Sequence, residues 1–165
     1  MLKEKLMDVR VKRNGNGDTR TADHIPDMDD FMEANVSHVN DVNEFCKQYS
    51  DILRMRGMNH DRTKFTYAYQ FYRDFCDVLE NKEKDFADME WHKQIHIVEE
   101  RHHLTSNCPD DVNLIDVMEM VIDCVCAGMA RSGKVRPLEI SDDILRKAVA
   151  NTAKEIEEAI QLEDA

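Results

Sequence analysis

The sequence predicts an all-α fold, a compact single-domain helical bundle of about five to six helices with a short irregular or hairpin N-terminal arm. Three observations point to this class. The 165 residues include only five glycines and three prolines, so few positions interrupt regular structure. Long stretches carry apolar residues three and four positions apart, which is the spacing of a buried helix face. Beyond the first few residues, no segment alternates polar and apolar residues as a strand would.

Residues 1–26 are expected to form the arm, and residues 27–165 the helical domain. Met7, Val9 and Val11 alternate weakly with polar residues, and a strong turn signal follows at residues 13–18, Arg-Asn-Gly-Asn-Gly-Asp. This segment is either a small hairpin or a mobile arm.

The first helix is predicted to begin after Pro26, capped by Asp27 or Asp29, and to end at Gly57. Its apolar positions define one buried face and are Phe31, Val39, Val42, Phe45, Tyr49 and Ile52. Four further helices are expected in the rest of the chain. They span residues 59–79 or 61–79, about 89–104, 109–132 and 144–162, the last with Ser141 as its N-cap.

The composition narrows the functional class. A net charge of −12 argues against binding to a nucleic-acid polymer, because such proteins need a Lys/Arg surface. No run is apolar enough to cross a membrane and the start of the chain lacks a signal-peptide core, so a cytoplasmic protein is expected. The five cysteines show no CxxC spacing and indicate reduced, mostly buried thiols.

The densest group of candidate functional residues lies between Trp91 and His103. On a helix, His92, His96, Glu99 and His103 are offset by four, three and four residues and share one stripe. Each neutral imidazole has a donor and an acceptor to satisfy, and protonated neighbours repel each other, so this stripe favours a metal site. A solvated polar face is the alternative.

Acidic residues form a similar stripe on the next predicted helix. Asp116, Glu119 and Asp123 are offset by three and four, and Asp123 sits in the otherwise apolar string 120–125. A carboxylate in such surroundings needs a metal or a charged partner. A metal therefore competes with a structural salt bridge from Asp123 to Arg101 or Arg131.

The third motif is His60-Asp61 at the start of a predicted helix, followed by Thr63-Lys64-Phe65. The imidazole and the carboxylate can reach one cation together, and the second carboxylate oxygen can bridge to another ion. Such a dipeptide is common by chance. It indicates a metal site only in combination with the other two motifs.

Taken in order, these residues resemble the signature of the HD-domain superfamily, whose members are helical, metal-dependent and mostly phosphohydrolases. That signature is a His, a later His-Asp pair and a final Asp, here His38, His60-Asp61 and Asp123. Members that hold two metals add histidines between the pair and the final Asp, as His96 with His102 or His103 would do.

A closer resemblance, on three motifs, is to an uncharacterised family of short HD-like proteins. The motifs are His-Asp-x-(Ser/Thr)-Lys-Phe, His-x5-His-His and Glu-Met-x2-Asp. They are matched here by residues 60–65, by His96 with His102-His103, and by Glu119-Met120 with Asp123. Two tryptophans of the family pattern are Leu104 and Cys124 in this chain, which keeps the ligands but alters the wall of any shared pocket.

The resemblance implies one or two divalent transition-metal ions (Mn, Fe, Co, Ni or Zn). A set of nitrogen and oxygen donors binds these metals better than it binds Mg or Ca. Asp61 would bridge the two ions. The first ion would be held by His38, His60, Asp61 and Asp123, and the second by His96 and His103, with His102 as a ligand or as a supporting partner. We expect Lys64 to contact a substrate phosphate and Glu119 to orient a ligand histidine or accept a proton. An ordinary solvated charge is the alternative for both.

The function expected from the resemblance is metal-dependent hydrolysis of a small phosphate ester, most naturally a nucleotide, by a metal-activated water. An HD-type di-iron oxygenase and a non-catalytic, metal-stabilised helical module are the alternatives. A ferritin-like site is disfavoured because Glu-x-x-His occurs on one predicted helix only. The expected partner is a small molecule, not a nucleic-acid polymer or a membrane, and a homo-oligomer stays open.

Overall fold

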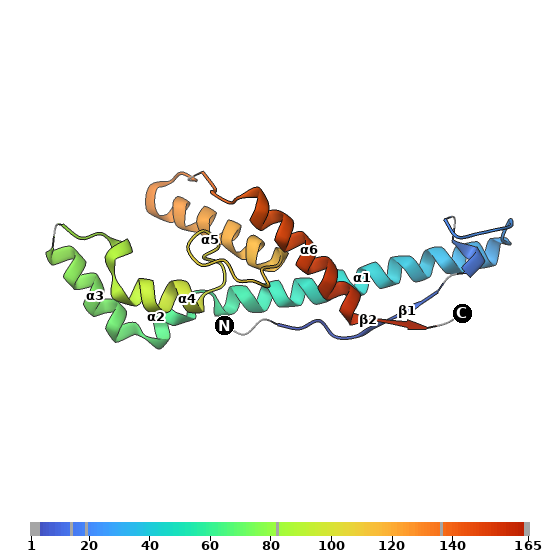
Figure 1. Ribbon diagram of the computed structural model, residues 1–165, viewed down its shortest axis with the longest axis horizontal. Coiled ribbons are helices and arrows are strands. Elements are labelled where there is room, and N and C mark those ends of the chain that lie inside the picture. The colour runs from blue at the N-terminus through green and yellow to red at the C-terminus, as the bar shows by residue number, and fades with distance from the viewer. Residues whose placement is uncertain (1–3, 14, 19, 82, 136, 164–165) are drawn as a thin grey trace. The chain divides into compact units, whose positions relative to one another are not determined.

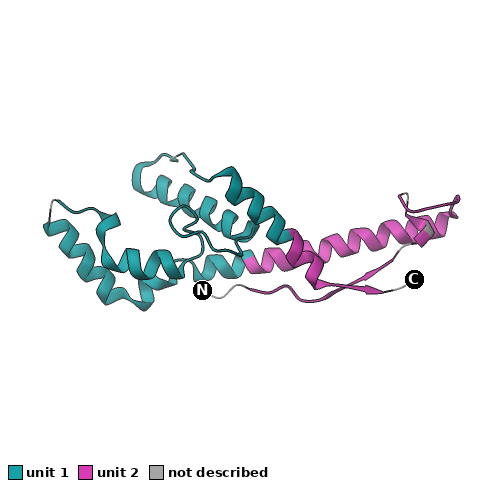
Figure 2. Ribbon diagram, viewed as in Figure 1, with its two compact units in different colours: residues 1–3, 53–152 teal, residues 4–52, 153–165 magenta. Residues whose placement is uncertain are grey.

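The computed structural model describes residues 4–13, 15–18, 20–81, 83–135 and 137–163. Most of these residues are helical (Figure 1). The predicted all-α class is confirmed. The described residues form two units: residues 53–152 make up unit 1, and residues 4–52 with 153–163 make up unit 2 (Figure 2). The division expected at residue 26 stays a prediction.

Unit 2 contains a small parallel sheet. Strand β1 (Val9–Lys12) pairs with β2 (Ile160–Glu163), and Val9 lies opposite Ile160. The sheet packs on residues 45–52 of α1 (Met28–Asn59) and on the end of α6 (Asp142–Ala159). The core residues that join them are Leu6, Val9, Phe45 and Ala159. The weak alternation in residues 7–11 was therefore a real strand signal, but its partner is a distant segment and not the second arm of a hairpin.

The turn signal corresponds to a single 3-10 turn, η1 (Gly15–Gly17); Asn14 lies outside the described residues. Gly17 approaches α1 so closely that a Cβ there would lie 2.6 Å from the Asp30 carbonyl oxygen. Glycine is required at this position because any side chain would force the turn away from the helix.

Helix α1 begins where the sequence predicted, and the Asp27 carboxylate accepts a hydrogen bond from Asp30 N at 2.9 Å. It continues two residues beyond Gly57, the predicted end. Its predicted apolar face is only partly buried, since Phe45 is buried but Val39 and Val42 are 63% and 48% exposed. The three-and-four spacing identified the helix correctly and overestimated how much of its apolar face is covered.

Unit 1 holds the elements that build the candidate site. In chain order they are α2 (Arg62–Thr66), α3 (Ala68–Glu80), η2 (Phe86–Asp88), the π-helical turn η3 (His92–His96), α4 (Ile97–Glu99), α5 (Leu114–Ser132) and the first part of α6. Two apolar cores stabilise them. One contains Val78, Met89 and Trp91, and the other contains Leu104, Val112, Met120 and Ala148.

Three predicted helix boundaries in unit 1 were wrong. The second predicted helix is broken at Tyr67 into α2 and α3. The third ends at Glu99, so residues 100–104 are not helical. The fourth begins at Leu114, because the Asn113 side chain and Asp116 form a capping box there. Its predicted end before Gly133 is confirmed.

Two further expectations can be compared with the structure. None of the helices in the described residues is long and apolar enough to cross a membrane. All five cysteines are free, but three are half-buried and two are exposed, so the expectation of mostly buried thiols was wrong.

Candidate metal centre

The centre begins at the short turn between α1 and α2, which contains His60 and Asp61. Asp61 has φ 56° and ψ 27°, the left-handed conformation, and is the one non-glycine with positive φ among the described residues. This conformation is unfavourable for a residue with a side chain, and Asp tolerates it better than most. The turn directs the Asp61 carboxylate toward three imidazoles, those of His60, His96 and His102.

Two overlapping groups of side chains bring donor atoms close enough to bind a metal ion, with all ligand atoms of a group within 4.8 Å of one another. The first group consists of Asp61, His96, His102 and His103, and the second of His60, His102 and Asp123. His102 belongs to both. The arrangement can therefore accept a metal ion at either of two adjacent positions.

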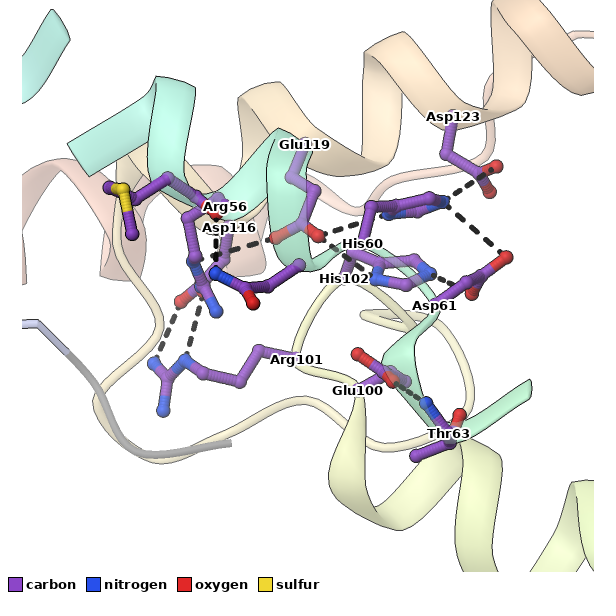
Figure 3. A network of polar contacts seen from close by, with 12 residues as sticks. Arg56, His60, Asp61, Thr63, Glu100, Arg101, His102, Asp116, Glu119 and Asp123 are labelled. Atoms are coloured by element: carbon purple, nitrogen blue, oxygen red, sulfur yellow. Dashed lines mark hydrogen bonds and ion pairs between the residues drawn. The ribbon is translucent and has the colours of Figure 1, made fainter. Parts of the chain in front are cut away.

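Glu119 on α5 supports the histidines from the side away from the aspartates. One of its oxygens lies 3.1 Å from Nδ1 of His60 and 3.4 Å from Nδ1 of His102. The Nε2 atoms of both rings then face the carboxylates, at 3.3 Å from Asp123 for His60 and at 3.6 Å from Asp61 for His102. Figure 3 shows Glu119 on one side of the two rings and both aspartates on the other. Such a partner fixes ring orientation and leaves Nε2 for a metal.

His96 is oriented in the same way by α2. The Thr63 hydroxyl lies 2.7 Å from His96 Nδ1, and His96 Nε2 is 3.3 Å from Asp61. Thr63 is fixed in turn, since its backbone N–H donates to the Glu100 carboxylate at 2.9 Å. The π-helical turn sets the ring position, because it stacks His96 on Trp91, five residues earlier, at 4.7 Å between centroids.

Behind Glu119 lies a buried network of charges. Asp116 is fully buried and binds two guanidinium groups, those of Arg56 and Arg101. Arg101 contacts both of its oxygens, at 2.9 and 2.8 Å, and Arg56 Nε lies 3.5 Å from the second oxygen of Glu119. Figure 3 shows this chain of contacts running from Arg101 to His60. Arg56 also stabilises the charge of Glu119 in a site that water reaches poorly.

The protonation states suit metal binding. Burial, reinforced by the neighbouring His103, lowers the pKa of His96 to about 3, and burial and His102 lower that of His103 to about 4. Both rings are therefore neutral at pH 7, the form that binds metals. His60 differs, because its contacts with Asp123 and Glu119 raise its pKa to about 10. Burial opposes ionisation of Glu119, but contacts with His102 and His60 outweigh it and lower the pKa to about 2.

The donor set fits a transition metal. Asp61 Oδ1, His102 Nε2 and His103 Nε2 are buried and have no hydrogen-bond partner among the described residues. Buried polar atoms without a partner are unfavourable unless an ion or water completes them. Nitrogen and carboxylate donors together suit Mn, Fe, Co, Ni or Zn. His96 and His102 are 4% and 2% exposed, which excludes the solvated-face alternative.

The structure brings together most of the predicted ligands and leaves one aside. The residues that meet are His60, Asp61, His96, His102, His103 and Asp123. His38 is exposed on α1 in unit 2 and belongs to neither group. The expectation that His96 and His103 share a helical stripe was wrong, because the helix ends at Glu99 and His103 lies in the following turn.

The two predicted catalytic residues lie beside the centre. Lys64 pairs with the Asp61 carboxylate, and Glu119 contacts the histidines as predicted for an orienting residue. The salt bridge considered for Asp123 is not found among the described residues, since Arg101 pairs with Asp116 and Asp111.

Sequence reasoning missed four supporting residues, Arg56, Thr63, Glu100 and Asp116. Two of them had a local signal: Asp116 stood in the acidic stripe and in the capping box that begins at Asn113, and Thr63 stood in the motif of residues 60–65, but neither was assigned a role. The others act through contacts with residues far along the chain, which spacing does not reveal.

A cavity of ≈290 Å³ borders the centre. His102, His103 and Asp123 line it together with residues of α5 and of the segment after α5. A small molecule that enters it therefore contacts the candidate ligands directly.

The fold and the site define a class, helical proteins with a clustered His/Asp site able to hold a metal ion. The chain belongs to a family of unknown function (DUF5662), whose model matches residues 27–162. Neither the curated proteins nor the solved structures contained a match.

Proposed function

We propose that this protein is a metal-dependent phosphohydrolase that acts on a small phosphate ester. The observation that carries the proposal is the cavity of ≈290 Å³ beside the candidate ligands His102, His103 and Asp123. A metal that only tied helices together would need no such space. The resemblance to HD-domain proteins favours the same class of reaction.

In hydrolysis a water oxygen bonds to phosphorus while the phosphorus–oxygen bond to the alcohol breaks, and the alcohol leaves with a proton. A bound transition metal would lower the pKa of a water and stabilise negative charge on a phosphoryl oxygen. The residues that would hold it are His60, Asp61, His96, His102, His103 and Asp123. Glu119 would keep His60 and His102 in position, and Thr63 would do the same for His96, through the contacts described above.

Lys64 is the proposed contact for the substrate phosphate. Its ammonium group pairs with Asp61, and its side chain is 34% exposed. A cation bound at Asp61 would weaken that ion pair by competing for the carboxylate. The Lys64 ammonium would then be available to a phosphoryl oxygen beside the ions.

The proposal covers small phosphate esters as a class. The superfamily resemblance makes a nucleotide the narrower candidate, but no Phe, Tyr or Trp side chain is among the described residues that line the cavity. Nothing in the lining therefore favours stacking of a base over a smaller alcohol.

The test combines metal analysis of the purified protein with a screen for phosphate release from nucleotides and simpler phosphate esters. Asp61→Asn should lose both metal and activity, whereas Asp77→Asn, which removes a surface aspartate paired with Lys84, should retain both. If Asp61→Asn keeps its full metal content, the proposed site is wrong.

A di-iron oxygenase is the second candidate, favoured by the histidine-rich donor set and by the two adjacent ion positions that share His102. Protein purified without oxygen would then contain iron and develop an optical band on exposure to oxygen. A protein that contains only zinc or manganese and releases phosphate would exclude this candidate.

A further inference from the structure

The cavity extends along α5, away from the candidate metal ligands. Its lining includes Asp123 and also Arg131, eight residues later on the same helix. At 1.5 Å per residue, these two positions lie about 12 Å apart along the helix axis. A molecule with one end at the ions can therefore have its other end near Arg131.

Arg131 differs from the arginines that support the centre. Arg56 and Arg101 both bind Asp116, but the side chain of Arg131, an exposed residue, has no hydrogen bond or ion pair with the described residues. A guanidinium group presents up to five N–H donors in a planar fork that matches carboxylate and phosphate groups. In a chain of net charge −12, a guanidinium group on a cavity wall without a carboxylate partner is available to an anion from outside.

Three small residues of α5, Cys124, Ala127 and Gly128, line the cavity between these two positions, and Leu104 and Met120 add apolar surface elsewhere on its wall. This surface can contact a short carbon chain. The volume of ≈290 Å³ is close to the lower limit of roughly 300 Å³ for small-molecule pockets, so the occupant must be compact.

From these observations we infer that Arg131 binds a second anionic group on the substrate. The substrate class is a phosphate ester whose alcohol carries a carboxylate or another phosphate a few carbon atoms from the ester oxygen. The inference rests on the proposed function for the phosphate end. It adds the residue that selects the leaving group.

Glu139 also lines the cavity and provides a competing prediction. A substrate whose far end is only positively charged would bind Glu139 and be repelled by Arg131. The experiment must therefore compare negative, neutral and positive ends on the same carbon chain.

Calorimetric binding to the zinc- or manganese-loaded protein provides this comparison. The ligands are alkyl phosphonates of equal chain length that end in a carboxylate, a methyl or an amino group. At the best length, the carboxylate form should bind about tenfold more tightly than the methyl form, as expected for one charge-assisted contact. Arg131→Gln should reduce this ratio to about one, and Arg146→Gln, at an exposed arginine of α6, should preserve it.

Equal affinity for the carboxylate and methyl forms would overturn the inference, as would a preference that survives in Arg131→Gln. Tightest binding of the amino form would overturn it in favour of Glu139. Phosphate release from the matching phosphate esters separates this result from the proposed function. If phosphate is released without a preference for the carboxylate form, the proposed hydrolase function stands and the proposed role of Arg131 is wrong. If the carboxylate form binds more tightly but no phosphate is released, the proposed hydrolase function is wrong and the anion site stands.

Discussion

Glu119 Oε1 lies 3.1 Å from Nδ1 of His60, and the opposite ring nitrogen of His60 lies 3.3 Å from Asp123. The imidazole is therefore held between two carboxylates, one on the supporting side and one on the ligand side. In the metal-free protein, the proton on Nε2 occupies the direction in which a metal would bind. Glu119 thereby controls both the orientation of His60 and its charge.

Replacing Glu119 with Gln should lower metal affinity by about 10- to 100-fold, as is typical when the partner of a ligand histidine is lost. The Gln amide has nearly the same shape as the carboxylate but carries no charge. It therefore no longer stabilises His60 and His102. Competition with a chelator measures the affinity, and circular dichroism verifies the helices. Glu80→Gln, at an exposed position of α3, is the matched control, and an affinity for Glu119→Gln within twofold of wild type would contradict the role assigned to Glu119.

Metal binding should release about one proton between pH 7 and pH 9, and His60 is its source. The pKa of His60 is raised to about 10 by Asp123 and Glu119, so the ring must lose a proton before it can bind a metal. His96 and His103, with pKa values of about 3 and 4, are already neutral. Affinity should rise about tenfold per pH unit in this range, and calorimetry in buffers of different ionisation enthalpy counts the proton. A pH-independent affinity would contradict this prediction.

The same histidines set the pH dependence of stability without metal. The pKa of His60 is raised, so its contribution is complete below its ordinary value of 6.5 and is lost as pH rises toward about 10. The pKa of His96 is lowered to about 3 and that of His103 to about 4, so acid favours the unfolded state as the pH falls from 6.5 toward these values. The midpoint of urea unfolding in the presence of chelator should therefore be highest near pH 6.5.

The sequence predicted the helical class and most of the candidate ligands, and it did so for different reasons. Helices such as α5 have a continuous apolar period and local caps, so their presence follows from nearby residues. The candidate ligands were inferred from the order of the motifs. That order gives the types of residue along the chain, but it does not give their positions relative to one another in space. His38 satisfied that order, but the structure puts it in neither group of donors.

The central place of His102 could not be predicted from spacing. A helix through residue 104 would have placed His96 and His103 on one face and His102 to the side. The helix instead ends at Glu99, and Glu100 contacts Thr63, far away in the sequence. This tertiary contact positions the turn in which His102 reaches both groups of donors, and no local pattern encodes it.

Asp61 provides a test of backbone strain at the centre. Asp61→Gly and Asp61→Ala both remove the carboxylate and should both lose metal. Because φ is 56°, the glycine variant should be more stable without metal than the alanine variant, by about 1 kcal/mol. At Arg73, an exposed position within α3, the order should reverse, with glycine about 1 kcal/mol less stable than alanine. Chemical unfolding of the four variants measures both differences, and the same order at the two positions would argue against strain at Asp61.

Asp116 and Asp111 both bind Arg101, and they should differ sharply when replaced. Asp116 is fully buried and shared with Arg56, so Asp116→Asn removes the anion common to two guanidinium groups and should lower the free energy of unfolding by about 3–5 kcal/mol. Asp111 is 53% exposed, and Asp111→Asn should cost less than about 1 kcal/mol.

Asp116→Asn should also weaken metal binding, because Arg56 contacts Glu119 and Glu119 orients His60. Urea unfolding and chelator competition measure the two effects. Equal losses of stability in the two variants would contradict the effect of burial, and an unchanged metal affinity in Asp116→Asn would show that the buried network does not support the centre.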